Sequence, residues 1–329
     1  MNLLKKLLVD IRNYGISVLH IYFSKLLLGI RYEYRVHQNQ GIAGQSIIIN
    51  NGLFTQVLTG LSRGSEFNGL VDPLETQFIT QYFAKNEAST TRICLDIGAN
   101  NGYYSCLFAS LGGKVFAFEP MPEFQNQLQE NIDINEFQNL VQLQQYAVSD
   151  ANGSISMSDG LVVTSDRVTN ATPCKVISLD SWCETRNLIN KISFLKIDVE
   201  GLEGKVIRGA QKVIEASKPV LLIEISPHTM HSFNDRAADI FNALVQQNYV
   251  AYQSPYPKIG INSLRFERIN SIKSINYANG INFLFVQDDD NDMVLPEFEL
   301  NNYTHYQPFS AIRPFINLLP PYKRKVEKS

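Results

Sequence analysis

Two acidic residues at the ends of apolar runs are the part of this sequence best suited to chemistry. Asp96 precedes a loop with glycines at positions 98 and 102, where backbone can approach a ligand closely and a following helix offers free amide groups. Asp96 stands where a dinucleotide-binding loop usually has its first glycine, and a carboxylate there suits a cationic ligand better than a pyrophosphate. Glu119 ends a second run 23 residues later, the separation at which an acid reaches ribose hydroxyls. The pair predicts a nucleoside-bearing ligand.

Three further acids and a histidine follow two later apolar runs. Asp198 and Glu200 end the run that begins at Ile192, whereas Glu224 and His228 end or follow the next one. Residues two apart on a strand share a face, so Asp198 and Glu200 are expected to point into one cleft. Carboxylates and histidine can take a proton from a hydroxyl nucleophile, and carboxylates can also hold a divalent ion such as Mg²⁺. These four residues are the predicted catalytic set, with Asp198 as the first candidate for the base.

Each of these residues also has a structural interpretation. Lys196 is on the same strand face as Asp198 and could neutralise it in an ion pair. Glu200 could simply begin the next helix, where acids are favoured, and an exposed loop histidine would explain His228. The acids can serve without a metal, and a bound divalent ion is the alternative.

The elements that must position these residues alternate between strands and helices. Such alternation predicts an α/β fold with a mostly parallel, doubly wound sheet covered by helices on both faces. Between two of these elements, residues 154–177 predict a hairpin or a loop near the site. The predicted strands cover residues 93–96, 114–118, 141–148, 192–199, 219–225, 249–253 and 281–286. The predicted helices cover residues 72–83, 122–136, 179–188, 202–216 and 236–247.

Composition limits the function classes. The chain has 329 residues, 44% of them apolar, which is enough for a large core. A formal net charge of −3 argues against a nucleic-acid partner, because such proteins usually carry a strong basic excess. The four cysteines show no CxxC spacing, and Cys94 and Cys106 fall in predicted core elements. We therefore expect reduced, buried thiols and a cytoplasmic setting, not a zinc site or disulfides.

The N-terminal region differs in character from the rest. Residues 13–30 are nearly long enough to span a bilayer, but His20 and Lys25 interrupt them. Residues 3–30 are therefore expected to form an amphipathic helix that packs on the domain, on a partner or peripherally on a membrane. A β-like run at 46–49 predicts a hairpin within residues 41–71. The predicted organisation is an extension at 1–71, a main domain at 72–290 and a C-terminal tail at 291–329.

Four motifs follow one another in a fixed order along the main domain. They are Leu-Asp-Ile-Gly-Ala-Asn at 95–100, Phe-Glu-Pro at 118–120, Leu-Lys-Ile-Asp-Val-Glu-Gly at 195–201 and Ile-Glu at 223–224. Together they resemble the FkbM family of S-adenosylmethionine-dependent methyltransferases, over roughly residues 70–290. The resemblance implies a Rossmann-like, seven-stranded class I methyltransferase sheet in which the last strand is antiparallel and lies between two others. It also implies methyl transfer to a hydroxyl oxygen of a sugar, glycan or related natural product.

The resemblance assigns the two acids to parts of the cofactor. Asp96 is expected to face the ammonium of the methionine moiety, and Glu119 to accept hydrogen bonds from the ribose. Met121 either lies against the adenine or belongs to the core. Asp150 is the nearest side chain for the adenine edge, or an ordinary turn former. The predicted cofactor residues are Asp96, Gly98, Asn100, Gly102, Tyr103, Glu119, Pro120, Met121, Ala147, Val148, Asp150 and Asp198.

Two other function classes stay open at this point. An NAD-dependent oxidoreductase shares an acid after its second strand but requires a GxGxxG loop, which is absent at 96–102. A non-catalytic nucleoside-binding or membrane-associated module is the other alternative. The sequence specifies neither the acceptor nor the oligomeric state.

Overall fold

The computed structural model describes the central part of the chain. The described residues are 31–36, 45–50, 54–59, 72–85, 91–158, 160–163, 171–254, 263–269, 281–288, 295 and 297–299. The predicted N-terminal helix at 3–30 and almost all of the C-terminal tail lie outside them. Among the helices within these ranges, none is long and apolar enough to cross a lipid bilayer.

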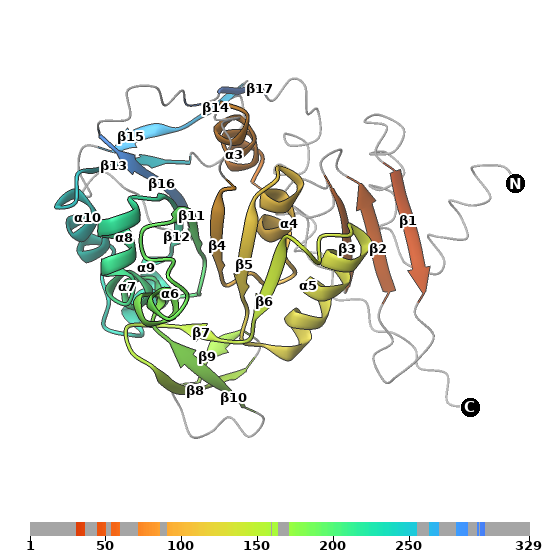
Figure 1. Ribbon diagram of the computed structural model, residues 1–329, viewed down its shortest axis with the longest axis horizontal. Helices are drawn as coiled ribbons and strands as arrows, with labels where there is room; N and C mark the ends of the chain where they lie inside the picture. Colours follow the sequence, from red (N-terminus) through yellow and green to blue (C-terminus); the bar gives the residue numbers. More distant parts are fainter. Residues whose placement is uncertain are drawn as a thin grey trace, which may run out of the picture.

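An eight-stranded sheet forms the framework of the domain (Figure 1). Five strands that are successive neighbours in the sheet pair in parallel, namely β6, β5, β4, β11 and β12. Strand β16 lies between β12 and β13 and is antiparallel to both. In spatial order the strands are β15 (Glu267–Ile269), β13 (Tyr249–Gln253), β16 (Ile281–Gln287), β12 (Val220–Ile225), β11 (Ile192–Ile197), β4 (Ile93–Ile97), β5 (Lys114–Phe118) and β6 (Val141–Gln144).

The sheet confirms the predicted α/β class and corrects its details. The antiparallel strand β16 lies between two others, as predicted, but β15 adds an eighth strand at one edge, so the sheet is mixed. The chain runs from β4 through β5 to β6 on one side, then returns to β11 and β12 on the other. This reversal places a topological switch point between β4 and β11, where α/β sheets bind ligands beyond the carboxyl ends of their strands.

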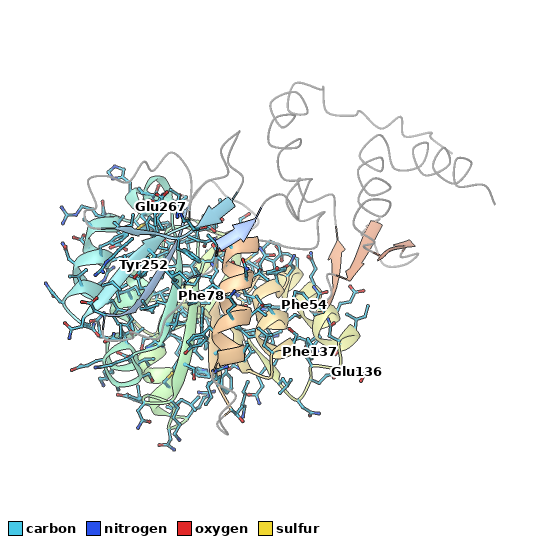
Figure 2. All side chains as sticks on the ribbon, turned by 90° about the horizontal axis from the view of Figure 1, so that it is seen from above. Phe54, Phe78, Glu136, Phe137, Tyr252 and Glu267 are labelled. Carbon is cyan, nitrogen blue, oxygen red and sulfur yellow. The ribbon has the colours of Figure 1, made fainter. Side chains whose placement is uncertain are left out.

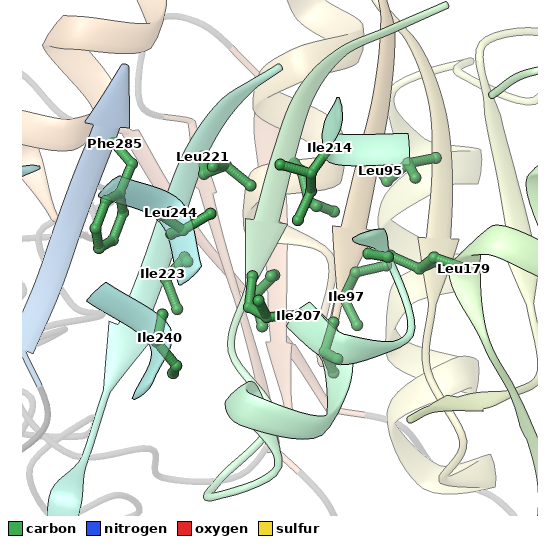
Figure 3. Close-up of a cluster of buried hydrophobic side chains, with 14 of the residues drawn as sticks. Leu95, Ile97, Leu179, Ile207, Ile214, Leu221, Ile223, Ile240, Leu244 and Phe285 are labelled. Atoms are coloured by element: carbon green, nitrogen blue, oxygen red, sulfur yellow. The ribbon is translucent and has the colours of Figure 1, made fainter. Parts of the chain in front are cut away.

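Two layers of helices bury the two faces of the sheet. One apolar cluster joins alternate strand residues, such as Leu95 and Ile223, to α6 (Leu179–Glu184), α7 (Glu203–Arg208), α8 (Gln211–Ser217) and α10 (Ala237–Val245) (Figure 3). The other cluster joins the intervening strand residues, such as Cys94 and Leu222, to α3 (Pro73–Lys85), α4 (Tyr103–Ser110) and α5 (Pro122–Ile134). Apolar residues at successive strand positions are buried on both faces, as a parallel sheet requires.

A smaller sheet lies beyond β6. It contains β7 (Ala147–Val148), β10 (Thr172–Ile177), β8 (Gly153–Ser158) and β9 (Leu161–Val162), in that spatial order. The antiparallel pairing of β8 and β10 confirms the hairpin alternative for residues 154–177. The single strand predicted at 141–148 is wrong, because the chain bends at Tyr146, whose N–H bonds to the carbonyl of Gln144, and β7 then pairs with β10.

Several element boundaries differ from the predictions. Strand β11 ends at Ile197, two residues before the predicted end. The helix predicted at 202–216 is two helices, α7 and α8, which are separated at Gly209 and Ala210. A Cβ on Gly209 would lie 2.1 Å from the carbonyl oxygen of Ser149, so the chain passes close to the end of β7 at this break.

The N-terminal strands form a sheet of their own. β1 (Arg31–Val36), β2 (Gln45–Asn50) and β3 (Thr55–Thr59) pair antiparallel, which extends the predicted hairpin by one strand. Phe54, which is labelled in Figure 2, lies just before β3. It is buried, and its ring contacts that of Tyr103 of α4. β14 (Ser263–Arg265) and β17 (Glu297–Glu299) form a further short ladder. All four cysteines are buried and unpaired, which confirms the core positions predicted for Cys94 and Cys106.

Candidate active site

The switch point between β4 and β11 brings the two halves of the predicted site together. The N–H of Asp198, just beyond β11, donates to the carbonyl of Ile97 at the end of β4. Gly98 has a φ of +79°, and a Cβ at this position would lie 1.8 Å from the Asp198 carbonyl oxygen. The predicted cofactor loop, residues 98–102, is therefore in backbone contact with Asp198, the predicted base. Only glycine fits at position 98.

The loop from Gly98 to Gly102 is fixed by main-chain bonds to the next strand. The N–H groups of Gly98 and Ala99 both donate to the carbonyl of Phe118, at 3.0 Å each. Gly102 precedes α4 with a φ of +87°, and a Cβ there would lie 2.2 Å from Leu128. The glycines therefore allow close packing with β11 and α5, and the start of α4 follows directly.

Glu119 lies at the end of β5, beside this loop. Its two carboxylate oxygens accept 2.9 Å hydrogen bonds from the N–H groups of Asn100 and Met121, and 4% of the residue is exposed. Burial raises the pKa of Glu119 to about 7. Each carboxylate oxygen has a second lone pair, so the group can still accept bonds from a ligand. The loop thus orients Glu119 before any ligand arrives.

Asp96 is buried beneath the loop on the α4 side of the sheet. Ser105 of α4 donates to its Oδ2 at 2.6 Å, and only 2% of Asp96 is exposed. Burial raises the pKa of Asp96 to about 6. A cation placed against this carboxylate would offset part of that desolvation cost.

A row of polar residues ends the strands on this same face of the sheet. Lys196 of β11 is opposite Asp96 in the strand register, and Glu224 of β12 is opposite Asn282 of β16. The preceding same-face residues, such as Phe194 and Leu222, belong to the apolar cluster under α3 and α4. The face therefore changes from apolar to polar at the carboxyl edge, where ligands bind in this class of sheet.

Lys196 and Asp198 form the ion pair that was the structural alternative for Asp198. The Lys196 Nζ lies 3.4 Å from Asp198 Oδ2, and the two side chains are 1% and 36% exposed. Burial raises the pKa of Glu224 to about 8, and the neighbouring Asp198 carboxylate adds to this effect. Asp198 thus lies between an ammonium and a carboxyl group, and part of its side chain is accessible to a ligand.

Sequence reasoning missed the contribution of α3. Asp72 was predicted only as the first residue of a helix, yet its Oδ2 accepts a 2.8 Å hydrogen bond from the Tyr104 hydroxyl. Glu75 is buried and accepts hydrogen bonds from the side chains of Ser254 and Asn282. Asp72 has a φ of +48°, an uncommon conformation for a non-glycine residue. Nothing in the sequence indicates this conformation, which is known only from the structure.

The other predicted site residues take different positions. The Tyr103 hydroxyl bonds to Thr76 of α3 at 2.8 Å, so its side chain faces α3. Met121, which is 2% exposed, packs in a cluster with Ala147 and Met157, in line with the core alternative. Val148 is buried in the core under α6 and α7. The carbonyl of Pro120 faces the thiol of Cys174.

The remaining acidic and histidine predictions divide in three ways. The Asp150 carboxylate lies 3.3 Å from the Arg208 guanidinium at the surface. Glu200 is exposed in a turn with a φ of +54°, so the strand alternation used to pair it with Asp198 does not reach it. His228 begins a short helix, α9 (Pro227–His231), but its side chain lies outside the described part of the structure. Within the described ranges, no three His, Cys, Asp or Glu side chains are grouped to hold a metal ion.

Buried carboxyl groups with raised pKa values make the fold more stable in acid than in base. Burial raises the pKa of Glu75 from 4.5 to about 7. Between these two pH values the folded state binds more protons than the unfolded state, so the free energy of unfolding falls as pH rises. A shift of this size amounts to about 3 kcal/mol at most. We expect the melting temperature of the ligand-free protein to fall between pH 5 and pH 8.

The Glu75→Gln variant isolates this contribution, because the amide cannot ionise. Its melting temperature should fall less steeply over pH 5–8 than that of the unaltered protein, as measured by differential scanning calorimetry. Glu215→Gln, an exposed change on α8, is the control and should keep the original slope. Equal slopes for Glu75→Gln and the unaltered protein would contradict the assignment.

The central part of the chain is similar to a known protein family. Residues 96–251 match the methyltransferase FkbM domain. This segment includes the cofactor loop, Glu119, the β11 end and Glu224, whereas α3 and β16 lie outside it.

Individual relatives are more distant. A curated protein from Haloferax volcanii, hexuronic acid methyltransferase AglP, is 29% identical over 140 residues, which are 41% of this chain and 57% of that relative. A solved methyltransferase FkbM from Methylobacillus flagellatus is 17% identical and covers 63% of this chain and 47% of its own, with a TM-score of 0.38. A SAM-dependent methyltransferase from Agrobacterium tumefaciens is 7% identical and covers 76% and 72%, with a TM-score of 0.44. The strand order, not these superpositions, carries the fold assignment.

Proposed function

Because residues 96–251 of this chain belong to the methyltransferase FkbM domain family, we propose that the protein moves a methyl group from S-adenosylmethionine to a hydroxyl oxygen of a sugar, glycan or related natural product. The observation that carries the proposal is the meeting of Asp96, Glu119 and Asp198 at one switch point. The first two suit a cationic nucleoside, and the third lies beside them with an accessible carboxylate.

The residues present fit this cofactor. Glu119 is already oriented by two main-chain bonds and has free lone pairs for ribose hydroxyls. Asp96 provides a buried carboxylate for the methionine ammonium, directly or through water. The glycine loop is held in place by close packing against β11 and α5, while the backbone groups of Ala147 and Val148 are the candidates for the adenine edge. When bound, the cofactor supplies an electrophilic methyl group.

Asp198 is the proposed base. It accepts the proton of the acceptor hydroxyl, whose oxygen forms a bond to the methyl carbon, while the electron pair of the broken carbon–sulfur bond stays on sulfur. The raised pKa of Glu224 favours its protonated form, so it can donate a hydrogen bond while Asp198 accepts the proton. Alignment of the oxygen with the methyl–sulfur bond supplies much of the acceleration in such a reaction.

The choice of a sugar acceptor rests on two supports. The Haloferax relative carries hexuronic acid in its name, although the match spans 57% of that protein. The acceptor side of the edge presents Asp198, Glu224 and Asn282, and carboxyl and amide groups are suited to hydrogen bonds with hydroxyls. We further propose a cytoplasmic protein that can contact a membrane peripherally through residues 3–30.

A labelled-cofactor screen tests the proposed reaction. The protein is incubated with methyl-labelled S-adenosylmethionine and a panel of sugars, glycosides and glycolipids, and each product is treated with mild alkali. We expect alkali-stable label, because ethers survive this treatment, whereas a methyl ester would release its label. Alkali-labile product would move the acceptor from hydroxyl to carboxylate, and transfer to none of the panel would contradict the proposed acceptor class.

The Glu119→Gln variant tests the cofactor assignment without an acceptor. Its amide NH₂ cannot accept the bond that one of the two loop N–H groups donates, and it removes a charged acceptor from the ribose site. A charged hydrogen bond is worth about 1.5–3 kcal/mol, so we expect S-adenosylmethionine to bind roughly 10- to 100-fold more weakly. Isothermal titration calorimetry measures the affinity. Glu215→Gln should leave it unchanged, and binding of NAD in place of S-adenosylmethionine would favour the oxidoreductase alternative.

A further inference from the structure

Lys196 is an unusual residue for the interior of a protein. Only 1% of its side chain is exposed, and no other lysine or arginine in the described part of the chain is buried to this degree. Lysine is almost never fully buried unless it is paired. The functional assignments above give Lys196 no role beyond its ion pair with Asp198.

The surroundings of Lys196 keep its ammonium charged. Burial alone would lower its pKa, but the carboxylates of Asp198, Glu224, Asp72 and Asp96 outweigh this effect and raise it. The Nζ lies 3.4 Å from Asp198 Oδ2 and 5.1 Å from the centre of the Tyr104 ring, a cation–π distance. The Lys196 ammonium therefore lies among four acidic side chains.

The position of this charge relates it to the cofactor. Lys196 is opposite Asp96 in the register of β11 and β4, and adjacent strands are about 4.8 Å apart. On the proposed function, Asp96 faces the methionine moiety of the donor and Asp198 faces the acceptor. A sulfonium is a cation, so the carboxylates attract it and Lys196 repels it.

We propose that Lys196 repels the sulfonium of the methyl donor and thereby limits the preference of the site for this cationic ligand over its neutral product. This inference rests on the proposed function. Because the repulsion exists only while the sulfur carries its charge, it is relieved when the methyl group leaves. An interaction that is less favourable in the bound reactant than later in the reaction lowers the barrier to transfer.

The matched ligands S-adenosylmethionine and S-adenosylhomocysteine test this idea without an acceptor. They differ by one methyl group and one charge, so the ratio of their affinities reports the electrostatic potential at the sulfur. A unit charge about 10 Å away, acting through an effective dielectric constant of about 20, changes affinity by roughly tenfold. In Lys196→Met the preference for S-adenosylmethionine over S-adenosylhomocysteine should therefore rise about tenfold, as measured by calorimetry at pH 7.5.

Lys114→Met is the matched control. Lys114 begins β5, so it lies at the opposite edge of the sheet, four residues or about 13 Å of strand from Phe118 at the site. This change removes the same charge from the protein and should alter the ratio less than twofold. Equal loss of affinity for both ligands in Lys196→Met would mean that Lys196 only supports the fold, and would overturn the inference.

A second variant covers the case in which Lys196→Met does not fold. Asp198→Asn removes a carboxylate from the same group, so it should shift the ratio in the opposite direction, towards S-adenosylhomocysteine. An unchanged ratio in Asp198→Asn would also overturn the inference. Failure of the unaltered protein to bind either ligand would instead overturn the proposed function.

Discussion

The Gly98→Ala variant is expected to lose at least about 3 kcal/mol of unfolding free energy and its affinity for the cofactor. Two costs add at this position. A non-glycine residue in the left-handed region costs roughly 1–2 kcal/mol, and the new Cβ would lie 1.8 Å from the Asp198 carbonyl oxygen. Since that oxygen belongs to backbone, β4 and β11 would have to separate at the switch point. Urea unfolding and calorimetry with S-adenosylmethionine measure the two losses.

Gly112→Ala separates the two costs. Gly112 has a φ of +83°, close to that of Gly98, but a Cβ there meets no atom within 4 Å. This control should lose only the backbone cost, about 1–2 kcal/mol, and should bind the cofactor normally. If both alanine variants lost the same stability, the contact between the loop and Asp198 would not be the reason for glycine at position 98.

The Asp198→Asn variant is expected to lose methyl transfer while it still binds cofactor. General-base catalysis typically contributes 10²- to 10⁴-fold, and turnover of an acceptor found in the labelled screen should fall by about that factor. Asparagine has nearly the same size, so the loop should keep its position. S-adenosylhomocysteine affinity should stay within about twofold, because this ligand lacks the sulfonium charge. Steady-state rates and calorimetry give both quantities.

Asp239→Asn is a suitable control for that experiment. Asp239 forms an exposed ion pair with Arg236 at the start of α10, a helix that packs on the other face of the sheet from Lys196 and Tyr104. Its turnover should differ less than twofold from that of the unaltered protein, because surface ion pairs contribute little. Loss of S-adenosylhomocysteine binding in Asp198→Asn would mean that Asp198 holds the cofactor and that the base is another residue.

Local sequence patterns were sufficient for the central strands and for one half of the site. Apolar runs ending in Asp96, Glu119 and Glu224 correspond to β4, β5 and β12, because strands buried on both faces require continuous apolar residues. The strand predicted at 141–148 failed because its apolar pattern continues through a bend that tertiary pairing with β10 imposes. β15 was missed because three residues are too few for a recognisable pattern.

The acceptor side was harder to predict because its residues come from distant parts of the chain. Asp72, Tyr104, Lys196 and Asn282 meet only after α3 and β16 have packed around β11 and β12. Local patterns in a single sequence do not indicate which distant residues come into contact. Lys196 was recognised as a partner of Asp198, but its burial depends on α3 and α4, which lie more than 85 residues earlier.

Helix α3 and strand β16 contribute Asp72, Glu75 and Asn282, and both elements lie outside residues 96–251. The proposed acceptor side of this edge therefore combines Asp198 and Glu224 from inside that segment with residues from both of its flanks. On the proposed function, mutations in α3 and β16 should alter the range of acceptors while the proposed donor-binding residues stay the same. Directed evolution of a new acceptor range should therefore begin with these flanking positions and leave the family segment intact.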